Sequence, residues 1–168
     1  MSLSMHDASA ASYQRSLRAL SAILDKAEAH ASSRKIEPSA LLQARLFPDM
    51  FTLSRQVQLT CDFAKNSCAR LTGVEAPKFE DKEASFPELK ERIAATLAFV
   101  GGLKAEQFEG SDRREITMKI AGNDMTLSGR DYLLGFAVPN FYFHAATAYD
   151  VLRHNGVELG KRDFIGAA

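Results

Sequence analysis

The 168-residue sequence has no tryptophan, only two cysteines and five prolines, and its 21 Lys and Arg residues are balanced by 21 Asp and Glu residues. Nonspecific nucleic-acid binding depends on an excess of basic side chains, so a net charge of zero argues against nucleic acid as a partner. The chain lacks an apolar run long enough to span a membrane, and its first ten residues lack the basic and apolar regions of a signal peptide. We therefore expect a cytoplasmic protein that binds neither nucleic acid nor membranes.

The common signatures of cofactor and hydrolase sites are also missing. The sequence contains no Cys-x-x-Cys pair, glycine-rich nucleotide loop, His-Glu-x-x-His zinc motif or Gly-x-Ser-x-Gly elbow. Cys61 and Cys68 are seven residues apart, which on a helix separates their Cα atoms by about 10 Å. A disulfide needs less than about 7 Å, so we predict two reduced, buried thiols that act as small apolar residues.

What the sequence does contain is helical periodicity. Apolar residues spaced three and four apart predict long amphipathic helices over residues 5–31, 51–71, 86–100 and 130–154, and a short helix over 38–42. Pro139 lies inside the last of these and predicts a kink or a new helix start there.

Between residues 114 and 128 the apolar period changes to two, with Gly122-Asn123 as a two-residue turn between the alternating runs, which predicts a β-hairpin. The chain is long enough for one hydrophobic core that needs neither disulfides nor a metal. We predict a mainly α fold: an up-and-down four-helix bundle with a short β-hairpin inserted before the last helix, forming one domain over residues 1–168.

The predicted 51–71 helix carries a polar stripe between two apolar sectors. On a helical wheel at about 100° per residue, Arg55, Gln58 and Asp62 fall between the main apolar face and a second apolar sector that contains Leu59 and Phe63. Polar residues flanked on both sides by apolar ones are expected to be enclosed by neighbouring elements rather than exposed.

The predicted last helix places His144 near the centre of its apolar face, with Asn140 one turn earlier. Each buried polar group without a partner costs roughly 1–3 kcal/mol, so such residues must satisfy one another or a ligand. The interior of a helical bundle is where such folds build binding sites. We therefore predict a polar pocket; its residues are Arg55, Gln58, Asp62, Asn140 and His144. The alternative is a closed hydrogen-bond network that only fixes the helix packing.

The segment from Asn140 to Gly156 resembles the closing helix of the DinB/YfiT-like superfamily of four-helix proteins, many of which hold a metal with three histidines. Residues 21–30, 48–51 and 155–164 are similar to a bacterial branch of that superfamily without an assigned function. In the superfamily one ligand lies on the second long helix and two lie four residues apart on the last. His144 matches the final ligand, Asn140 stands at the position before it, and the 51–71 helix offers only Gln58 or Asp62.

The resemblance thus implies a pocket with an incomplete metal site, in which Asp62, Asn140 and His144 could bind a divalent metal only weakly. One hypothesis is an enzyme for small molecules, of the thiol-dependent transferase or isomerase type. His144 would act in it as general base or sole strong metal ligand, Asp62 would orient His144, and Arg55 would bind an anionic group. The alternative is a noncatalytic bundle whose polar network is structural and which acts through dimerisation or a protein partner. Under either hypothesis we expect a homodimer.

Overall fold

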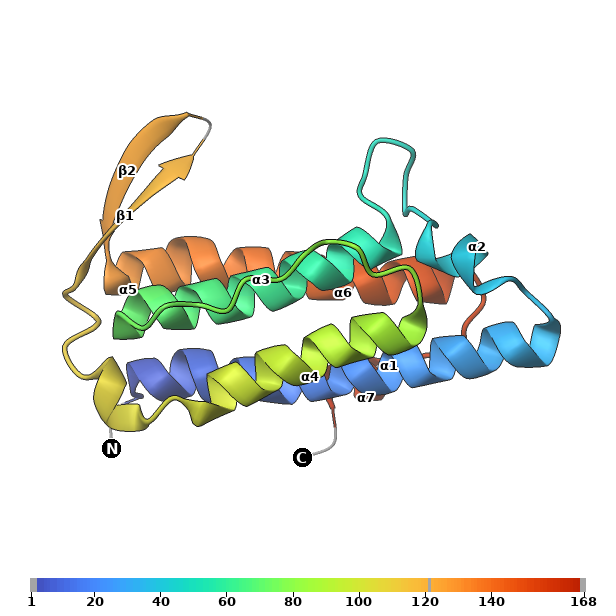
Figure 1. Cartoon of the computed structure of the whole chain (residues 1–168), viewed down its shortest axis with the longest axis horizontal. Helices are drawn as coiled ribbons and strands as arrows, with labels where there is room; N and C mark the ends of the chain where they lie inside the picture. The colour runs from blue at the N-terminus through green and yellow to red at the C-terminus, as the bar shows by residue number, and fades with distance from the viewer. Residues whose placement is uncertain (1–2, 121, 167–168) are drawn as a thin grey trace.

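Four long helices lie side by side along the long axis of the molecule (Figure 1). The computed structural model describes residues 3–120 and 122–166. Its long helices are α1 (Ser12–Arg34), α3 (Leu53–Thr72), α4 (Phe86–Gly102) and α6 (Val138–His154). The short helices α2 (Pro38–Leu42) and α5 (Gly129–Tyr132) lie in the connections between them, and α7 (Lys161–Ile165) follows α6. Strands β1 (Glu115–Ile120) and β2 (Asn123–Ser128) form an antiparallel hairpin. The predicted helical bundle with a hairpin before its last long helix is confirmed.

The helices surround one hydrophobic core. The apolar face predicted for α3 is fully buried, including Leu53, Val57, Cys61 and Cys68. The hairpin contributes through Ile116 on the inward side of β1. None of the described helices is both long enough and apolar enough to cross a bilayer.

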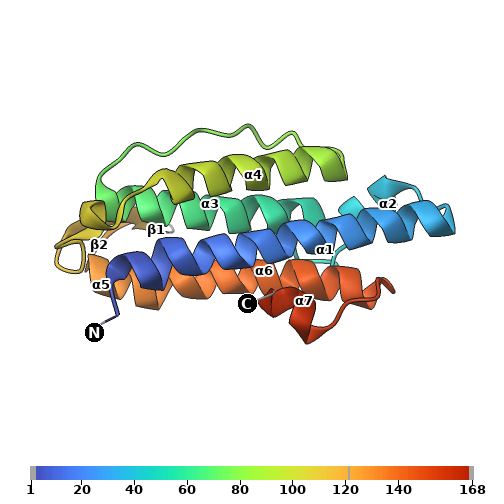
Figure 2. The ribbon, with the colours of Figure 1, turned by 90° about the horizontal axis from the view of Figure 1, so that it is seen from below.

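Residues 73–85, which we call the strap, form a long connection from the end of α3 to the start of α4 (Figure 1). The strap runs back along the bundle, so α3 and α4 point in the same direction (Figure 2). Helix α3 has 20 residues and is about 30 Å long, a distance that an extended chain at about 3.3 Å per residue covers easily. The bundle therefore includes one crossover, which the up-and-down order expected from the sequence does not.

Side-chain caps fix where α3 and α4 begin. The side chain of Thr52 accepts a hydrogen bond from the backbone N–H of Arg55, and that of Ser85 accepts one from the N–H of Glu88. Gly73, at φ +79°, ends α3 in the left-handed region that favours glycine. These caps set the register in which α3 presents its polar residues.

The last helix starts anew beside Pro139, one of the two alternatives predicted from the sequence, and a wide turn precedes it. Residues Leu133–Ala137 form a π-helical turn between α5 and α6, and Pro139 follows in the first turn of α6. The side-chain amide of Asn140 donates to the carbonyl of Phe136 at 2.8 Å. A proline in the first turn removes no hydrogen bond that α6 needs, and α6 continues to His154. Such π turns often occur at functional sites.

Two further details differ from the sequence prediction. Ile120 pairs with Asn123, so Asn123 belongs to β2 and not to the turn as expected; residue 121 lies outside the described residues. Helix α7 was not predicted. It packs against α1, where Lys26 Nζ donates to Asp163 Oδ1 at 2.7 Å.

Candidate functional site

His144 on α6 is hydrogen-bonded to Gln56 on α3, across the most extensive helix contact of the bundle. Its Nδ1 lies 2.7 Å from Gln56 Oε1, and the two residues are 8% and 1% exposed. Gln56 Nε2 faces the carbonyl oxygen of Phe51 at 3.5 Å, which directs the amide oxygen of Gln56 toward the imidazole. Because Gln56 Oε1 only accepts, Nδ1 must carry the proton and Nε2 the lone pair.

Two aromatic rings enclose the imidazole of His144. Phe63 stacks on it with ring centroids 5.5 Å apart, and the exposed Phe143 meets it edge-on at 5.3 Å. Burial, and secondarily the positive charge of Arg55, hold the pKa of His144 below its ordinary value. At neutral pH the side chain is therefore uncharged. No described residue forms a hydrogen bond to His144 Nε2, so this nitrogen can accept a proton or bind a ligand.

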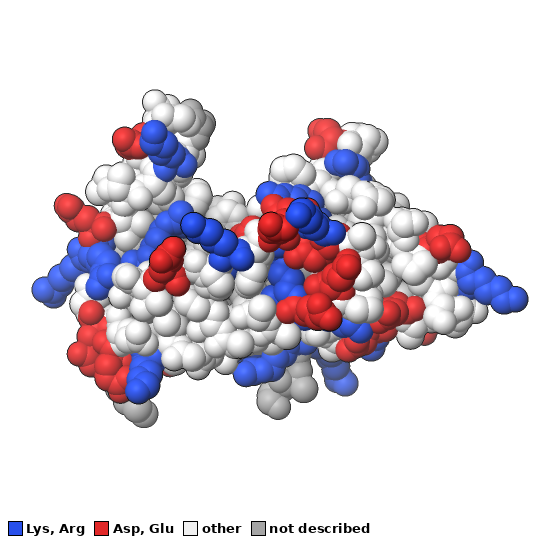
Figure 3. All heavy atoms as spheres, viewed as in Figure 1, with Lys and Arg blue, Asp and Glu red and all other residues white. Residues whose placement is uncertain are grey.

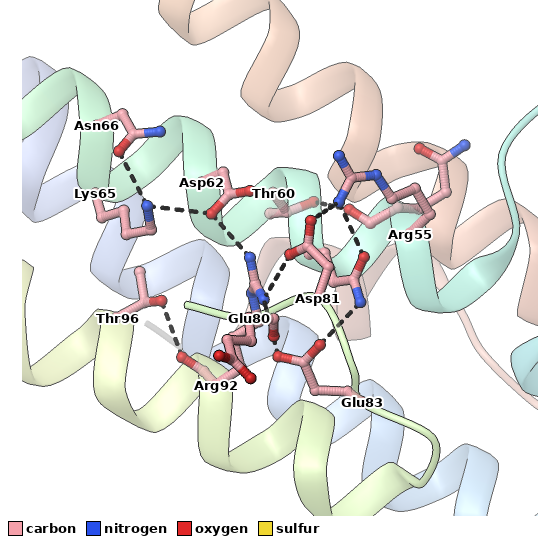
Figure 4. Close-up of polar contacts among 12 residues, drawn as sticks. Arg55, Thr60, Asp62, Lys65, Asn66, Glu80, Asp81, Glu83, Arg92 and Thr96 are labelled. Carbon is pink, nitrogen blue, oxygen red and sulfur yellow. Dashed lines mark hydrogen bonds and ion pairs between the residues drawn. The ribbon is translucent and has the colours of Figure 1, made fainter. Parts of the chain in front are cut away.

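Arg55 and Gln58 on α3 bind the strap, and Figure 4 shows Arg55 beside Asp81. Arg55 Nη1 lies 2.5 Å from Asp81 Oδ2 and 3.1 Å from Gln58 Oε1. Gln58 Nε2 donates to Glu83 Oε2 at 2.8 Å. Although partial burial opposes it, hydrogen bonding and the charge of Arg55, with a further contribution from Arg92, lower the pKa of Asp81. Asp81 is therefore ionised and paired at neutral pH.

Arg92 of α4 completes this network. Its side chain is 2% exposed, and its guanidinium nitrogens lie 2.9 Å from Asp62 Oδ1, 2.8 Å from Glu83 Oε1 and 3.0 Å from Asp81 Oδ1. Lys65 Nζ lies 3.2 Å from the same oxygen of Asp62. We call this set of six charged side chains the strap network; its members are Arg55, Asp62, Lys65, Asp81, Glu83 and Arg92.

The strap network contains three cations and three carboxylates, and each carboxylate is within ion-pair distance of at least one cation. Charged side chains gather over this part of the surface (Figure 3). These paired charges hold the strap to α3 and α4.

The structure does not bring the five residues of the predicted pocket together. Arg55, Gln58 and Asp62 bind the strap and α4, whereas His144 pairs with Gln56 and Asn140 bonds within its own helix. The expectation that Asp62 orients His144 is not met, since none of the described contacts joins them. The reason is that the polar stripe faces the strap, while the second apolar sector of α3 faces α6.

Gln56 is the site residue that the sequence analysis missed. On the helical wheel it lies within about 20° of Phe63, inside the second apolar sector that the sequence did reveal. A lone glutamine in that sector, seven residues before the ring that stacks on His144, was the available signal.

The residues present do not fit the metal that the superfamily resemblance implies. Among the described residues, no group of three His, Cys, Asp or Glu side chains is placed to hold a metal ion. Asp62 Oδ1 is paired with both Arg92 and Lys65, the Asn140 amide nitrogen binds a helix carbonyl, and His144 Nδ1 binds Gln56. The predicted set of Asp62, Asn140 and His144 is therefore dispersed and does not form a metal site.

A groove of about 330 Å³ lies next to this site, between α3 and the hairpin. Its lining residues are Leu59, Asp62, Phe63, Asn66, Arg70, Met118, Lys119 and Phe136. Phe63 contributes one face to the groove and stacks on His144, and Phe136 meets Phe63 at 5.9 Å. The groove thus lies one aromatic ring away from the imidazole of His144.

Comparison with known proteins identifies the family. A family described as a domain of unknown function, DUF1993, matches residues 5–165. The crystal structure of a DinB family member protein from Shewanella denitrificans is similar, with 42% sequence identity and a TM-score of 0.92 over 98% of this chain and 93% of that one. No curated protein matches the sequence significantly. The biochemical function of the family is thus unknown, and the chain belongs to the DUF1993 family with a DinB-like fold.

Proposed function

We propose that this protein binds a small molecule beside α3 and α6, and that His144 Nε2 accepts a proton from it. The observation that carries the proposal is the 2.7 Å hydrogen bond from His144 Nδ1 to Gln56 Oε1. This bond fixes the tautomer, and a lowered pKa keeps the ring neutral at pH 7. The same bond would stabilise the imidazolium that forms when Nε2 takes up a proton, which is how an oriented histidine acts as a general base.

The reaction class that we propose is thiol-dependent transfer. A thiol has an ordinary pKa of about 8.5 and is mostly protonated at neutral pH, so a base that removes the proton makes it a stronger nucleophile. His144 Nε2 would take the thiol proton while sulfur forms a bond to an electrophilic carbon, and the leaving group would depart with its electron pair. The Phe63 and Phe143 rings would keep bulk water away from the imidazole.

The test measures the transfer of cysteine or glutathione to chlorodinitrobenzene, which releases chloride and gives a coloured thioether. We expect the wild-type protein to exceed the rate without protein, and His144→Gln to lose the increase. His154→Gln is the matched control, because His154 is an exposed residue at the end of the same helix. Equal rates for wild type and His144→Gln, with both thiols, would overturn the proposal.

A second candidate function is a noncatalytic one through self-association. Phe47, Phe51 and Phe143 are 64%, 53% and 56% exposed, and two of them border the Gln56–His144 pair. Exposed aromatic side chains of this kind are typical of interaction surfaces. On this basis we propose a homodimer. Sedimentation velocity, which measures the oligomeric state, tests the proposal. Phe47→Ser with Phe51→Ser should shift the protein toward monomer, whereas Ile165→Ser, at an exposed apolar position on α7, should not. If the wild-type protein is monomeric at all concentrations, function through self-association is rejected.

The cytoplasmic location expected from the sequence also stays a proposal. Cys61 and Cys68 are both free and buried, which is consistent with a reducing compartment.

A further inference from the structure

The groove between α3 and the hairpin is small and is lined in part by apolar side chains. Leu59 and Phe63 come from α3, Met118 from β1, and Phe136 from the π-helical turn before α6. Its volume of about 330 Å³ lies at the lower end of the range of small-molecule sites, about 300–1,000 Å³. The volume and the apolar side chains therefore suit a small molecule with an apolar part better than a peptide.

Hydrogen-bond donors line one side of this groove. Asn66 and Arg70 lie four residues apart on α3, so their side chains are neighbours on one face. Asn66 Oδ1 accepts from Lys65 Nζ at 3.0 Å, and its amide NH₂ group has no partner among the described residues. Arg70 donates to the hydroxyl of Tyr132 at 3.0 Å and lies over that ring, and no described carboxylate pairs with it.

The charges around the groove favour an anion. Lys119 is an exposed cation on the hairpin wall, opposite Asp124 in the strand register, and no described ion pair joins the two. The acid that lines the groove, Asp62, is already paired with Arg92 and Lys65. Arg70 and Lys119 therefore remain available to bind an anion, because no described carboxylate pairs with them. A charge-assisted hydrogen bond to a guanidinium is among the stronger polar contacts.

We propose that this groove binds an aromatic molecule that carries a carboxylate or sulfonate group. The ring packs on Leu59, Phe63 and Phe136, and the anionic group binds Arg70, with Asn66 and Lys119 as further donors. This inference does not depend on the proposed function, because the ring of Phe63 separates the groove from His144.

The test compares two fluorescent probes that differ in charge. Anilinonaphthalene sulfonate has two aromatic groups and an anion, and phenylnaphthylamine is its neutral counterpart. In the variant Arg70→Gln/Lys119→Gln we expect the dissociation constant of the sulfonate to rise roughly tenfold or more, as the loss of a hydrogen bond to a charged group implies. The dissociation constant of the neutral probe should change by less than about twofold.

The control variant is Arg153→Gln/Lys161→Gln, which removes two exposed cations outside the groove. It should bind both probes as wild type does. The inference is overturned if wild type does not bind the sulfonate, if Arg70→Gln/Lys119→Gln binds it unchanged, or if that variant weakens both probes equally. Unchanged binding would place the probe elsewhere, for example in the apolar cavity of about 410 Å³ near Leu133 and Leu134.

The same probes separate this inference from the proposed function. His144 does not line the groove, so His144→Gln should bind the sulfonate within about twofold of wild type. Charge-dependent probe binding in a protein without thiol transfer activity would support the groove and reject the role of His144. Thiol transfer without charge-dependent probe binding would support the role of His144 and reject the groove as an anion site.

Discussion

At the scale of single residues, Gln56 fixes the tautomer of His144. Because burial lowers the pKa of His144, the unfolded chain binds a proton more readily than the folded protein, and stability falls as pH drops below the ordinary pKa of about 6.5. Replacing Gln56 by Glu places a carboxylate at Nδ1, which should raise the pKa of His144 above its unfolded value. The stability of Gln56→Glu should then fall as pH rises through the new pKa. Urea unfolding on both sides of about pH 6.5, with an NMR titration of His144, measures this reversal.

Asp62→Asn is the control for this reversal. Asp62 pairs with Arg92 and Lys65 and forms no described contact with His144, so the titration of His144 should stay close to that of wild type. Gln56→Leu leaves the Nδ1–H without an acceptor and should lower stability at pH 7 by roughly 1–3 kcal/mol. A large change in the pKa of His144 in Asp62→Asn, with none in Gln56→Glu, would show that Asp62 orients the ring after all.

The two thiols provide a second prediction at this scale. Burial raises the pKa of Cys61 and of Cys68 to about 12, and the thiolate is the reactive form. A disulfide reagent such as dithionitrobenzoate should therefore label neither cysteine in the native protein, and both after unfolding in denaturant. Ser32→Cys, at an exposed position near the end of α1, should react at once. Rapid labelling of the wild-type protein would contradict the burial of these thiols.

At the scale of elements, the strap network joins three segments through Arg92. Removing one member of a buried ion pair typically costs roughly 3–5 kcal/mol. Asp62, Asp81 and Glu83 each keep one other partner when Arg92 is replaced, so we expect Arg92→Met to lower the free energy of unfolding by about 3 kcal/mol, the lower end of that range. Equilibrium unfolding in urea gives the value.

Lys90→Met is the matched control for Arg92→Met. Lys90 lies on the same helix and also bridges two carboxylates, Asp25 and Glu28, each at 2.8 Å, but its side chain is 26% exposed. Solvent screens such pairs, so the loss should be at most about 1 kcal/mol. If both variants lose the same stability, burial does not distinguish the two ion-pair clusters, and the strap is not held mainly by Arg92.

The elements also show how far sequence reasoning reaches. Periodicity located the long helices and the hairpin, because burial of one face imposes a three-to-four or two-residue spacing locally. It did not locate α7, a five-residue helix held by the long-range pair of Lys26 and Asp163. Periodicity also could not predict the direction of α4, because that direction depends on the path of the strap and not on a local pattern.

The candidate site could be predicted only in part for a related reason. A helical wheel gives the angle of each residue on its own helix but not which neighbour lies at that angle. His144 was correctly placed on a buried face. Asp62 was assigned to the same pocket because the positions of α4 and the strap around α3 were unknown.

At the scale of the whole molecule, zinc tests whether this bundle retains a metal-binding position. Wild type lacks a fitting ligand set, so zinc should leave its melting temperature unchanged. Gln56→His with Asn140→His surrounds His144 with two further imidazoles. At a hundred times its dissociation constant, zinc should then add about 2.7 kcal/mol, or roughly 5–10 °C for a chain of this length. Adding His144→Gln should abolish the shift. The opposite result is that zinc stabilises the wild-type protein and fails to stabilise His144→Gln. That result would contradict the prediction, because it would show that His144 binds the metal.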